Sequence, residues 1–251
     1  MEKLLNTFSP ISLEEMSAVK LMNRTDTKFV TTMPVLCQLL KMAGKDYYIQ
    51  EIGGERNMSY DTTYFDTNEM AMFYEHQHGH TNRQKIRFRT YVNSHLQFME
   101  IKTKNNHGRT KKKRIEVADM NLRDQAKRAF LSANLHYDID SLRPTISNKF
   151  DRITLVNRAK TERLTIDTNL RFHNEVTGQE RNMGQLVVIE LKRDGLCYSP
   201  VLNMLRELRV KPHGFSKYCM GAAFTNEQLQ VNRFKPKMND INRMLECKTT
   251  K

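Results

Sequence analysis

The sequence repeats one pattern along much of its length: short segments in which apolar and charged residues alternate with a period of two. In 84–91, Ile86 and Phe88 would point to one side of an extended chain, and the charged residues between them to the other. The same alternation recurs in 24–28, 98–102, 111–117, 162–167 and 187–192. This period is typical of strands with one buried face. The pattern therefore predicts a sheet with one apolar and one charged face.

Helix signals lie between and after these strands. Ser12 and Glu15 have the spacing of a capping box, which predicts a helix over 12–22. Three other segments have helical periodicity: 33–43, 122–135 and 200–210. Strand-like segments at 59–66 and 149–156 bring the expected number of strands to about eight.

The connections between the strands favour an antiparallel arrangement. The polar segments 105–110 and 168–182 are hairpin candidates. We therefore expect an α+β fold, an eight-stranded antiparallel β-barrel with helices packed outside. Because no repeat or linker divides the chain, residues 1–225 are expected to form a single domain. Residues 226–251 are polar and basic, and we expect a C-terminal tail that is partly ordered at best.

The sequence shows no sign of secretion or membrane insertion. No apolar run approaches the roughly 18 residues of a membrane span, and the first ten residues lack the apolar core of a signal peptide. No cysteine pair has CxxC spacing, and no histidine lies at zinc-ligand spacing from a cysteine; the cysteines are Cys37, Cys197, Cys219 and Cys247. A reducing cytoplasm is the expected location.

An excess of positive charge needs an explanation. The chain has 41 Lys and Arg against 28 Asp and Glu, a formal net charge of +13. Nucleic acid, an anionic membrane and a small polyanion are the usual partners of such a chain. For any one strand, a solvated outer face is the simpler interpretation of its charges. Six strands with the same alternation favour a different arrangement, in which the charged faces converge.

Converging charged faces would gather about seven to nine Lys and Arg with four or five carboxylates. Burying such charges unpaired costs several kcal/mol each, so the surface must be wet, internally paired and suited to a strong anion. Arg and Lys bind phosphate oxygens, and carboxylates supply the hard oxygen ligands of Mg²⁺ or Mn²⁺. The combination predicts metal-assisted phosphoryl transfer. Carboxylates on the same face argue against a specific nucleic-acid surface.

The alternating histidines His76, His78 and His80 offer a second metal-site hypothesis. They lie in the polar, glycine-containing segment EHQHGHTN, which is also typical of a solvated hairpin turn. We favour the turn.

Eight motifs in order carry a family resemblance. They are RTDTKF at 24–29, TTYFDT at 62–67, KIRFRTY at 85–91, FMEIKTK at 98–104, KKKRIEV at 111–117, RLTIDTNL at 163–170, VVIELK at 187–192 and GFSKYCMG at 214–221. Over about residues 20–225 the chain resembles the VTC domain, the catalytic domain of vacuolar polyphosphate polymerases, which is found also as stand-alone bacterial proteins. That domain belongs to the CYTH-like superfamily of triphosphate tunnel metalloenzymes. The resemblance implies an eight-stranded tunnel that binds ATP and triphosphate or polyphosphate, with Mn²⁺ or Mg²⁺ as cofactor.

The resemblance also implies site residues. The phosphate ligands would be Arg24, Lys28, Arg87, Arg89, Lys102, Arg114, Arg152, Arg163, Lys192 and Lys217. The principal metal ligand would be Glu190, with help from Glu100 and from Glu116 or Asp167.

The first strand departs from the usual tunnel pattern. Tunnel triphosphatases usually begin with ExExK, whereas this chain has Arg24, Asp26 and Lys28. Replacing the first carboxylate by Arg adds phosphate affinity and removes a metal ligand, as in the VTC branch. This favours a polymerase that adds the γ-phosphate of ATP to a growing chain.

Two alternatives remain open. Water could replace the acceptor chain, which would make the protein a tripolyphosphatase or nucleoside triphosphatase. A module that binds polyphosphate or nucleic acid without turnover is the other, and the basic run 111–114 would suit it, although one face of a hairpin explains that run as well. Any membrane function would require a separate membrane partner.

Overall fold

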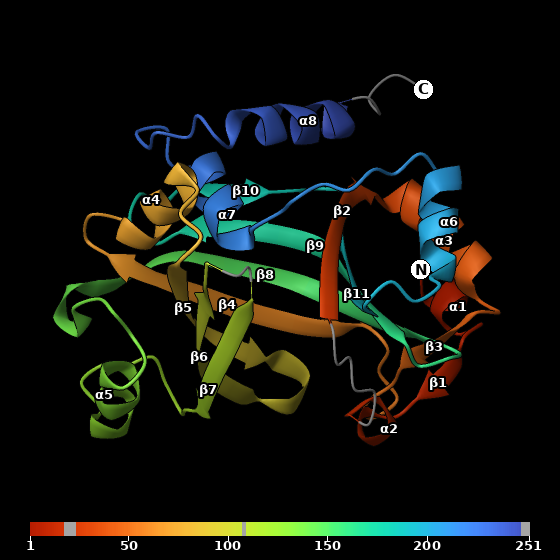
Figure 1. Ribbon diagram of the computed structural model, residues 1–251, viewed down its shortest axis with the longest axis horizontal. Helices are drawn as coiled ribbons and strands as arrows, with labels where there is room; N and C mark the ends of the chain where they lie inside the picture. Colours follow the sequence, from red (N-terminus) through yellow and green to blue (C-terminus); the bar gives the residue numbers. More distant parts are fainter. Residues whose placement is uncertain (18–23, 107–108, 247–251) are drawn as a thin grey trace.

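Eight antiparallel strands form one curled sheet in the computed structural model, which describes residues 1–17, 24–106 and 109–246 (Figure 1). In their order across the sheet they are β2 (Arg24–Thr32), β11 (Leu186–Asp194), β9 (Glu162–Asn174), β8 (Leu142–Asn157), β4 (Met58–Thr67), β5 (Arg83–Tyr91), β6 (Leu96–Lys104) and β7 (Thr110–Glu116). Three short strands extend it: β1 (Ser9–Ile11), β3 (Tyr47–Gln50) and β10 (Glu180–Asn182). The predicted α+β class and the antiparallel eight-strand sheet are confirmed.

Helices surround the sheet. They are α1 (Glu2–Leu5), α2 (Leu13–Ser17), α3 (Met33–Ala43), α4 (Ala71–His78), α5 (Gln125–Ser132), α6 (Pro200–Glu207), α7 (Lys217–Thr225) and α8 (Lys235–Glu246). The predicted capping box is confirmed, since the amide of Ser12 donates to Glu15 and the amide of Glu15 donates to the Ser12 hydroxyl, both at 3.1 Å. The remainder of that predicted helix, after Ser17, lies outside the described residues.

The convex face of the sheet buries the apolar half of the alternating pattern. Under α3 and α6, the strands β2, β8, β9 and β11 contribute a continuous cluster that includes Phe29, Leu164 and Ile189. Under α5, the strands β5 and β6 contribute a second cluster that includes Phe88 and Met99. Because successive strand residues alternate in direction, burial of these side chains turns the charged residues between them onto the concave face.

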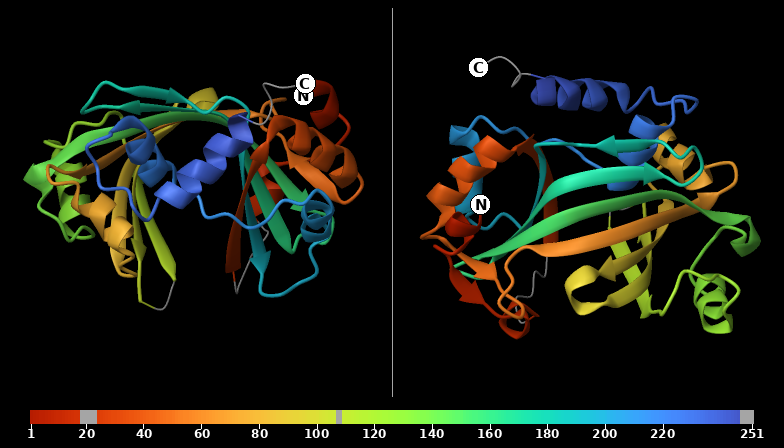
Figure 2. Two further views of the ribbon diagram at one scale, coloured as in Figure 1. Left: turned by 90° about the horizontal axis from the view of Figure 1, so that it is seen from above. Right: turned by 180° about the vertical axis from the view of Figure 1, so that it is seen from behind.

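The sheet is a half-barrel rather than a closed tunnel. Among the described residues, β7 and β2, the two ends of the strand order, share no ladder. Seen from above, the walls that end in β7 and β2 stand apart (Figure 2). Edge strand β7 is exposed at every position except Ile115. Its run of four cations from 111 to 114 is a known way to prevent edge-to-edge pairing with another sheet.

Helices α7 and α8 cover one end of the concave face. There the strands carry apolar residues in place of charges: Val30 and Val188 lie in one buried cluster with Tyr218 of α7 and Ile241 of α8. The chain after residue 225, which we expected to be partly ordered at best, thus contributes a helix to the core (Figure 1). Its apolar residues recur at helical spacing within a mostly polar sequence, so composition alone obscured them.

The prediction of a turn over the three histidines was wrong for His76 and His78, because α4 extends to His78 and only His80 lies beyond its end. Its first amides are capped from a distance: the buried carboxylate of Asp66 accepts from the backbone N–H groups of Met72 and Phe73, each at 2.9 Å. Gly79, with φ of 83°, ends the helix in the left-handed conformation. No cluster of three or more metal-ligating residues occurs within the described ranges, the histidines included.

No helix in the described part of the chain is both long and apolar enough to cross a membrane.

Candidate functional site

Strand register brings the predicted charged residues onto one face. Cross-strand partners in a sheet point to the same side. Reading across the ladder, these partners are Lys28 and Glu190, Lys192 and Arg163, Asp167 and Arg152, Tyr64 and Arg87, Arg87 and Glu100, and Glu100 and Arg114. Tyr60, on β4, connects the pairs on β2, β11, β9 and β8 with those on β5, β6 and β7, because it pairs with both Phe150 of β8 and Tyr91 of β5. We call this surface, between β2 and β7, the charged groove.

Asp167 joins two cations on the groove floor. Arg152 makes a bidentate contact with it, with Nε 2.6 Å from Oδ1 and a terminal nitrogen 2.8 Å from Oδ2. Lys217, from α7, forms an ion pair with the same carboxylate. Burial opposes ionisation of Asp167, but the two cations outweigh it and hold its pKa below the ordinary value. Burial lowers the pKa of Lys217 to about 8 although Asp167 raises it.

Glu100 has the same role on the opposite wall. Its carboxylate is fully buried and accepts from Arg87 Nε at 2.7 Å and from Lys112 Nζ at 3.0 Å. Burial alone would raise its pKa, yet Arg87, Arg89 and Lys112 lower the pKa of Glu100 to about 2. Both oxygens are therefore committed to holding cations in place.

Glu190 is the most accessible of the three inner carboxylates. Its side chain is 24% exposed, compared with 0% for Glu100 and 5% for Asp167. It forms an ion pair with Lys192, and Lys28 Nζ lies 3.8 Å from its other oxygen. Burial raises the pKa of Glu190, but Lys192 and Lys28 outweigh this and keep it ionised.

Lys102 and Arg163 are among the groove cations that form no ion pair with a carboxylate in the described part of the chain. The ammonium of Lys102 forms no hydrogen bond or ion pair within the described residues, and the nearby charge of Arg87, together with burial, holds its pKa well below the ordinary value. The buried Nε of Arg163 has no hydrogen-bond partner in that part of the chain either. Unpaired cations that face one another destabilise a protein. Their arrangement suits an anion that enters the groove.

Arg89 lies over aromatic rings rather than a carboxylate. Its Nε donates to Thr62 Oγ1 at 3.1 Å, and its guanidinium carbon lies 5.5 Å from the ring centre of Tyr60. Burial, followed by repulsion from Arg87, lowers the pKa of Arg89 to about 10, so the side chain stays charged. Phe150 stacks on Tyr60 with ring centres 5.2 Å apart and supports Lys217 at 4.1 Å.

The other predicted residues lie at the rim. Arg24 is paired with Asp26 at 2.7 Å and is 44% exposed. Arg114 lies on the exposed edge strand, over the ring of Phe98 at 4.5 Å. Glu116 is exposed at the end of the same strand, and is not gathered with the inner carboxylates.

The predicted site residues omitted several members of the groove, among them Lys112, Tyr60 and Phe150. Lys112 contacts Glu100. It lies two residues before Arg114, which was predicted as a phosphate ligand. Tyr60 and Phe150 form the aromatic floor, and they occupy polar-face positions of their strands. An aromatic residue at a position where the pattern expects a charge was the available signal.

A metal ion fits this groove only if the protein and the substrate bind it together. The four predicted carboxylates are not brought together, and among the described residues no three metal-ligating side chains meet. Mg²⁺ and Mn²⁺ bound to phosphates usually need only one or two carboxylates, because substrate oxygens and water complete the shell. Glu190 has the exposure for this, and one of its oxygens has its nearest cation, Lys28 Nζ, only at 3.8 Å. Glu100 and Asp167 are more buried, and each has both oxygens hydrogen-bonded to cations.

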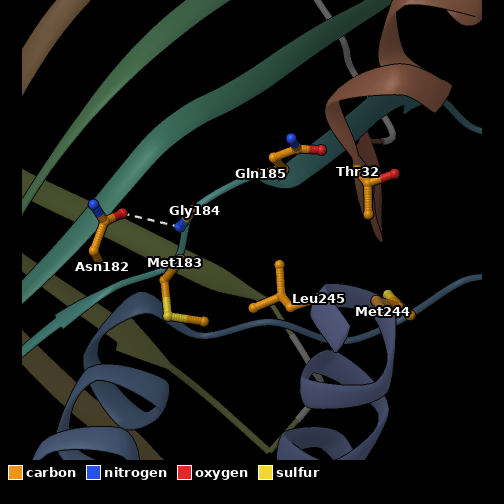
Figure 3. A pocket seen from close by; sticks show the side chains of 7 residues that line it. All are labelled: Thr32, Asn182, Met183, Gly184, Gln185, Met244 and Leu245. Atoms are coloured by element: carbon orange, nitrogen blue, oxygen red, sulfur yellow. Dashed lines mark hydrogen bonds between the residues drawn. The ribbon is translucent and has the colours of Figure 1, made fainter. Parts of the chain in front are cut away.

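A pocket of about 370 Å³ lies elsewhere, between α8 and the turn that joins β10 to β11 (Figure 3). Met183 and Leu245 line it, and the side chain of Asn182 accepts from the amide of Gly184 at 2.9 Å across the turn. It contains no cation that could bind phosphate. The charged groove is therefore the candidate functional site.

Acid should weaken the fold through Glu100. Its pKa falls from an ordinary 4.5 to about 2 on folding, so its ionised form contributes stability above about pH 4.5 that is lost as pH falls towards 2. We expect the free energy of unfolding, measured by urea denaturation between pH 2 and 7, to fall over this window. Glu100→Gln should be less stable than wild type at pH 7 and should flatten the slope. An unchanged slope would contradict the assigned ion pairs.

Comparisons with known proteins identify the family of this chain. The family model described as "VTC domain" matches residues 23–226. A protein from Hippeastrum, described as a proposed adenylyl cyclase with a dominant triphosphatase activity, aligns with a TM-score of 0.51 and 13% identity, over 84% of this chain and all of its own. A proposed adenylate cyclase from Bacillus halodurans aligns with a TM-score of 0.49 and 13% identity, over 78% of this chain and 96% of its own. No curated protein sequence matches. At such identities, the likeness to the first structure shows the fold alone.

Proposed function

Because this chain belongs to the VTC-domain family, we propose that it is a metal-dependent polyphosphate polymerase. It would transfer the γ-phosphate of ATP to the terminal phosphate oxygen of a growing polyphosphate chain and release ADP. The charged groove would hold both reactants. No covalent protein nucleophile is required, because phosphoryl transfer depends mainly on positioning and charge neutralisation.

The unpartnered cations carry this proposal. Internal ion pairs already satisfy Glu100 and Asp167, yet Lys102 and the Nε of Arg163 have no partner among the described residues. A groove that served only stability would not retain such groups, since repulsion among them is unfavourable. A polyphosphate carries regularly spaced charge along a thin chain, which suits cations distributed over several strands.

The inner residues would have separate tasks. Arg87, Arg89 and Lys102 would bind the transferred phosphate and its neighbours, with Arg87 held in place by Glu100. Glu190 would bind Mn²⁺ or Mg²⁺ together with phosphate oxygens, and the ion would supply further charge neutralisation there. Lys217 and Arg152, fixed by Asp167, would hold the neighbouring part of the chain.

Hydrolysis is the second function to consider. The Hippeastrum structure is described as having a dominant triphosphatase activity. The same groove would catalyse hydrolysis if water, rather than a phosphate chain, attacked the γ-phosphate. The replacement of the first-strand carboxylate by Arg24 favours the polymerase.

Purified protein incubated with ATP and Mn²⁺ separates these functions. We expect long-chain polyphosphate and ADP in amounts that match the phosphate transferred. Free phosphate without polymer would identify a hydrolase instead. Tight tripolyphosphate binding with no turnover would reduce the protein to a binding module. A parallel reaction with EDTA should yield neither polymer nor free phosphate.

A further inference from the structure

Lys85 is a groove lysine whose ammonium contacts only groups without formal charge. It lies on β5 two residues from Arg87, and Lys102 is its cross-strand partner. Its Nζ is 2.8 Å from Ser216 Oγ, 3.0 Å from His76 Nδ1 and 3.7 Å from Cys219 Sγ. Within the described ranges no carboxylate forms an ion pair with it.

The contact with His76 fixes the state of the imidazole. A protonated Lys85 has no lone pair and can only donate, so Nδ1 accepts and the ring is neutral; the Sγ of Cys219 also lies 2.9 Å from this Nδ1. Burial, followed by repulsion from Lys85, lowers the pKa of His76 to about 2, which agrees with this assignment. Lys85 therefore joins β5 to α4 through His76 and to α7 through Ser216.

Ser216 is the capping residue of α7. Its hydroxyl oxygen accepts from the backbone N–H of Cys219 at 3.3 Å, and the same oxygen accepts from Lys85. Lys85 thus fixes the rotamer of the cap and the start of the first helical turn. The next residue along the chain is Lys217, which enters the groove, pairs with Asp167 and lies over Phe150.

A second contact holds the same turn. The hydroxyl of the buried Tyr218 donates to Asp66, the carboxylate that also accepts from the first amides of α4. Lys217 therefore lies between two anchored neighbours, Ser216 and Tyr218. Only the contact with Ser216 comes from a cation of the groove itself.

We propose that Lys85 is a positioning residue for Lys217. Its ammonium holds the cap of α7, so that the Lys217 ammonium lies on the groove floor where phosphate would bind. This inference rests on the proposed phosphate-binding groove. The role that it gives to Lys85 does not require direct contact with the substrate.

A double-mutant cycle tests the proposal with inorganic tripolyphosphate as the probe. Lys85→Met and Lys217→Met should each weaken binding, measured by calorimetry, by about tenfold. If Lys85 acts through Lys217, the double variant should bind no more weakly than Lys217→Met alone. Losses that multiply would make Lys85 an independent phosphate ligand and would overturn the proposal. Wild-type affinity in Lys85→Met would overturn it too.

Substitutions at the cap provide a test that leaves the groove charge unchanged. Ser216→Ala removes the oxygen that Lys85 binds, and it should reproduce the loss seen with Lys85→Met. Ser216→Thr keeps a hydroxyl and should restore binding to within about twofold. These variants decide the matter if Lys85→Met fails to fold. Lys111→Met, on the outward face of β7, is the matched control and should bind as wild type does.

A readout that needs no substrate separates this inference from the proposed function. The ionisation of Lys217 can be followed by ¹³C reductive methylation and NMR. Burial is the main reason why the pKa of Lys217 is lowered to about 8, so a displaced side chain should titrate closer to the ordinary 10.5. We expect that rise in Ser216→Ala but not in Lys111→Met. An unshifted titration would overturn the positioning role even if tripolyphosphate binds. A wild-type protein that does not bind tripolyphosphate would contradict the proposed function alone.

Discussion

Glu190→Gln should lower turnover of ATP in the presence of Mn²⁺ by about a thousandfold. Several kcal/mol of charge stabilisation depend on Glu190, the most accessible of the three inner carboxylates, and this free energy corresponds to that factor. The same variant should bind tripolyphosphate at least as tightly as wild type when EDTA is present, because a negative charge that repels phosphate has been removed. Initial rates and calorimetry on one preparation would measure both effects.

The opposite signs of the two effects make this test specific. A variant that had merely lost its structure would lose binding as well as turnover. Glu69→Gln, at an exposed turn position, is a suitable control and should leave both quantities unchanged. Full turnover in Glu190→Gln would rule out the metal-binding role assigned to this residue.

Lys102→Met should raise the stability of the protein and lower its affinity for tripolyphosphate. The Lys102 ammonium has no partner in the described part of the chain, and repulsion from Arg87 disfavours its charged form. For a lysine, a lowered folded-state pKa means that the protonated form costs stability at neutral pH. Replacement by an uncharged side chain of similar length should raise Tm by about 2–4 °C, which corresponds to about 1 kcal/mol for a chain of this size. Tripolyphosphate affinity should fall by at least tenfold.

The outward-facing Lys111 provides the comparison for this substitution. Lys111→Met removes the same charge from the neighbouring strand but from its exposed face. It should change neither Tm nor affinity appreciably, because exposed charges contribute little. A decrease in Tm for Lys102→Met would show that the lysine has a stabilising partner and would contradict the unpaired geometry. Such a gain in stability with a loss of binding is expected where a site holds charges that the fold alone would not keep.

The side of the sheet that each strand residue faces could be predicted from sequence because one rule decides it. Alternation assigns each residue to a face, and apolar residues identify the buried one. This placed Arg87, Glu100 and Asp167 on one surface before any strand order was known, and the ladder confirms it. The eight motifs in order did the same for the fold.

Pairing and capping at a distance could not be predicted in this way. Whether Glu100 is free to bind a metal or already held by Arg87 depends on rotamers and on which strands are neighbours. Helix α4 was missed because its cap, Asp66, belongs to the preceding strand rather than to the helix sequence. Helix α8 was missed because its few apolar side chains form a buried face only when they pack in the cluster that contains Val30 and Val188. These features depend on tertiary contacts, which a local pattern does not contain.

The missing ladder between β7 and β2 has a mechanical consequence. A closed barrel has a fixed circumference, whereas a sheet whose two edges are not joined to each other can change its curvature without breaking a hydrogen bond between those edges. Cations on the facing walls repel one another and favour a flatter sheet, while an anionic chain between them attracts both walls. We therefore expect the groove to be widest when it is empty and to narrow as each phosphate is added. High salt should make the widths of the empty and the filled groove more alike, because screening weakens both the repulsion and the attraction.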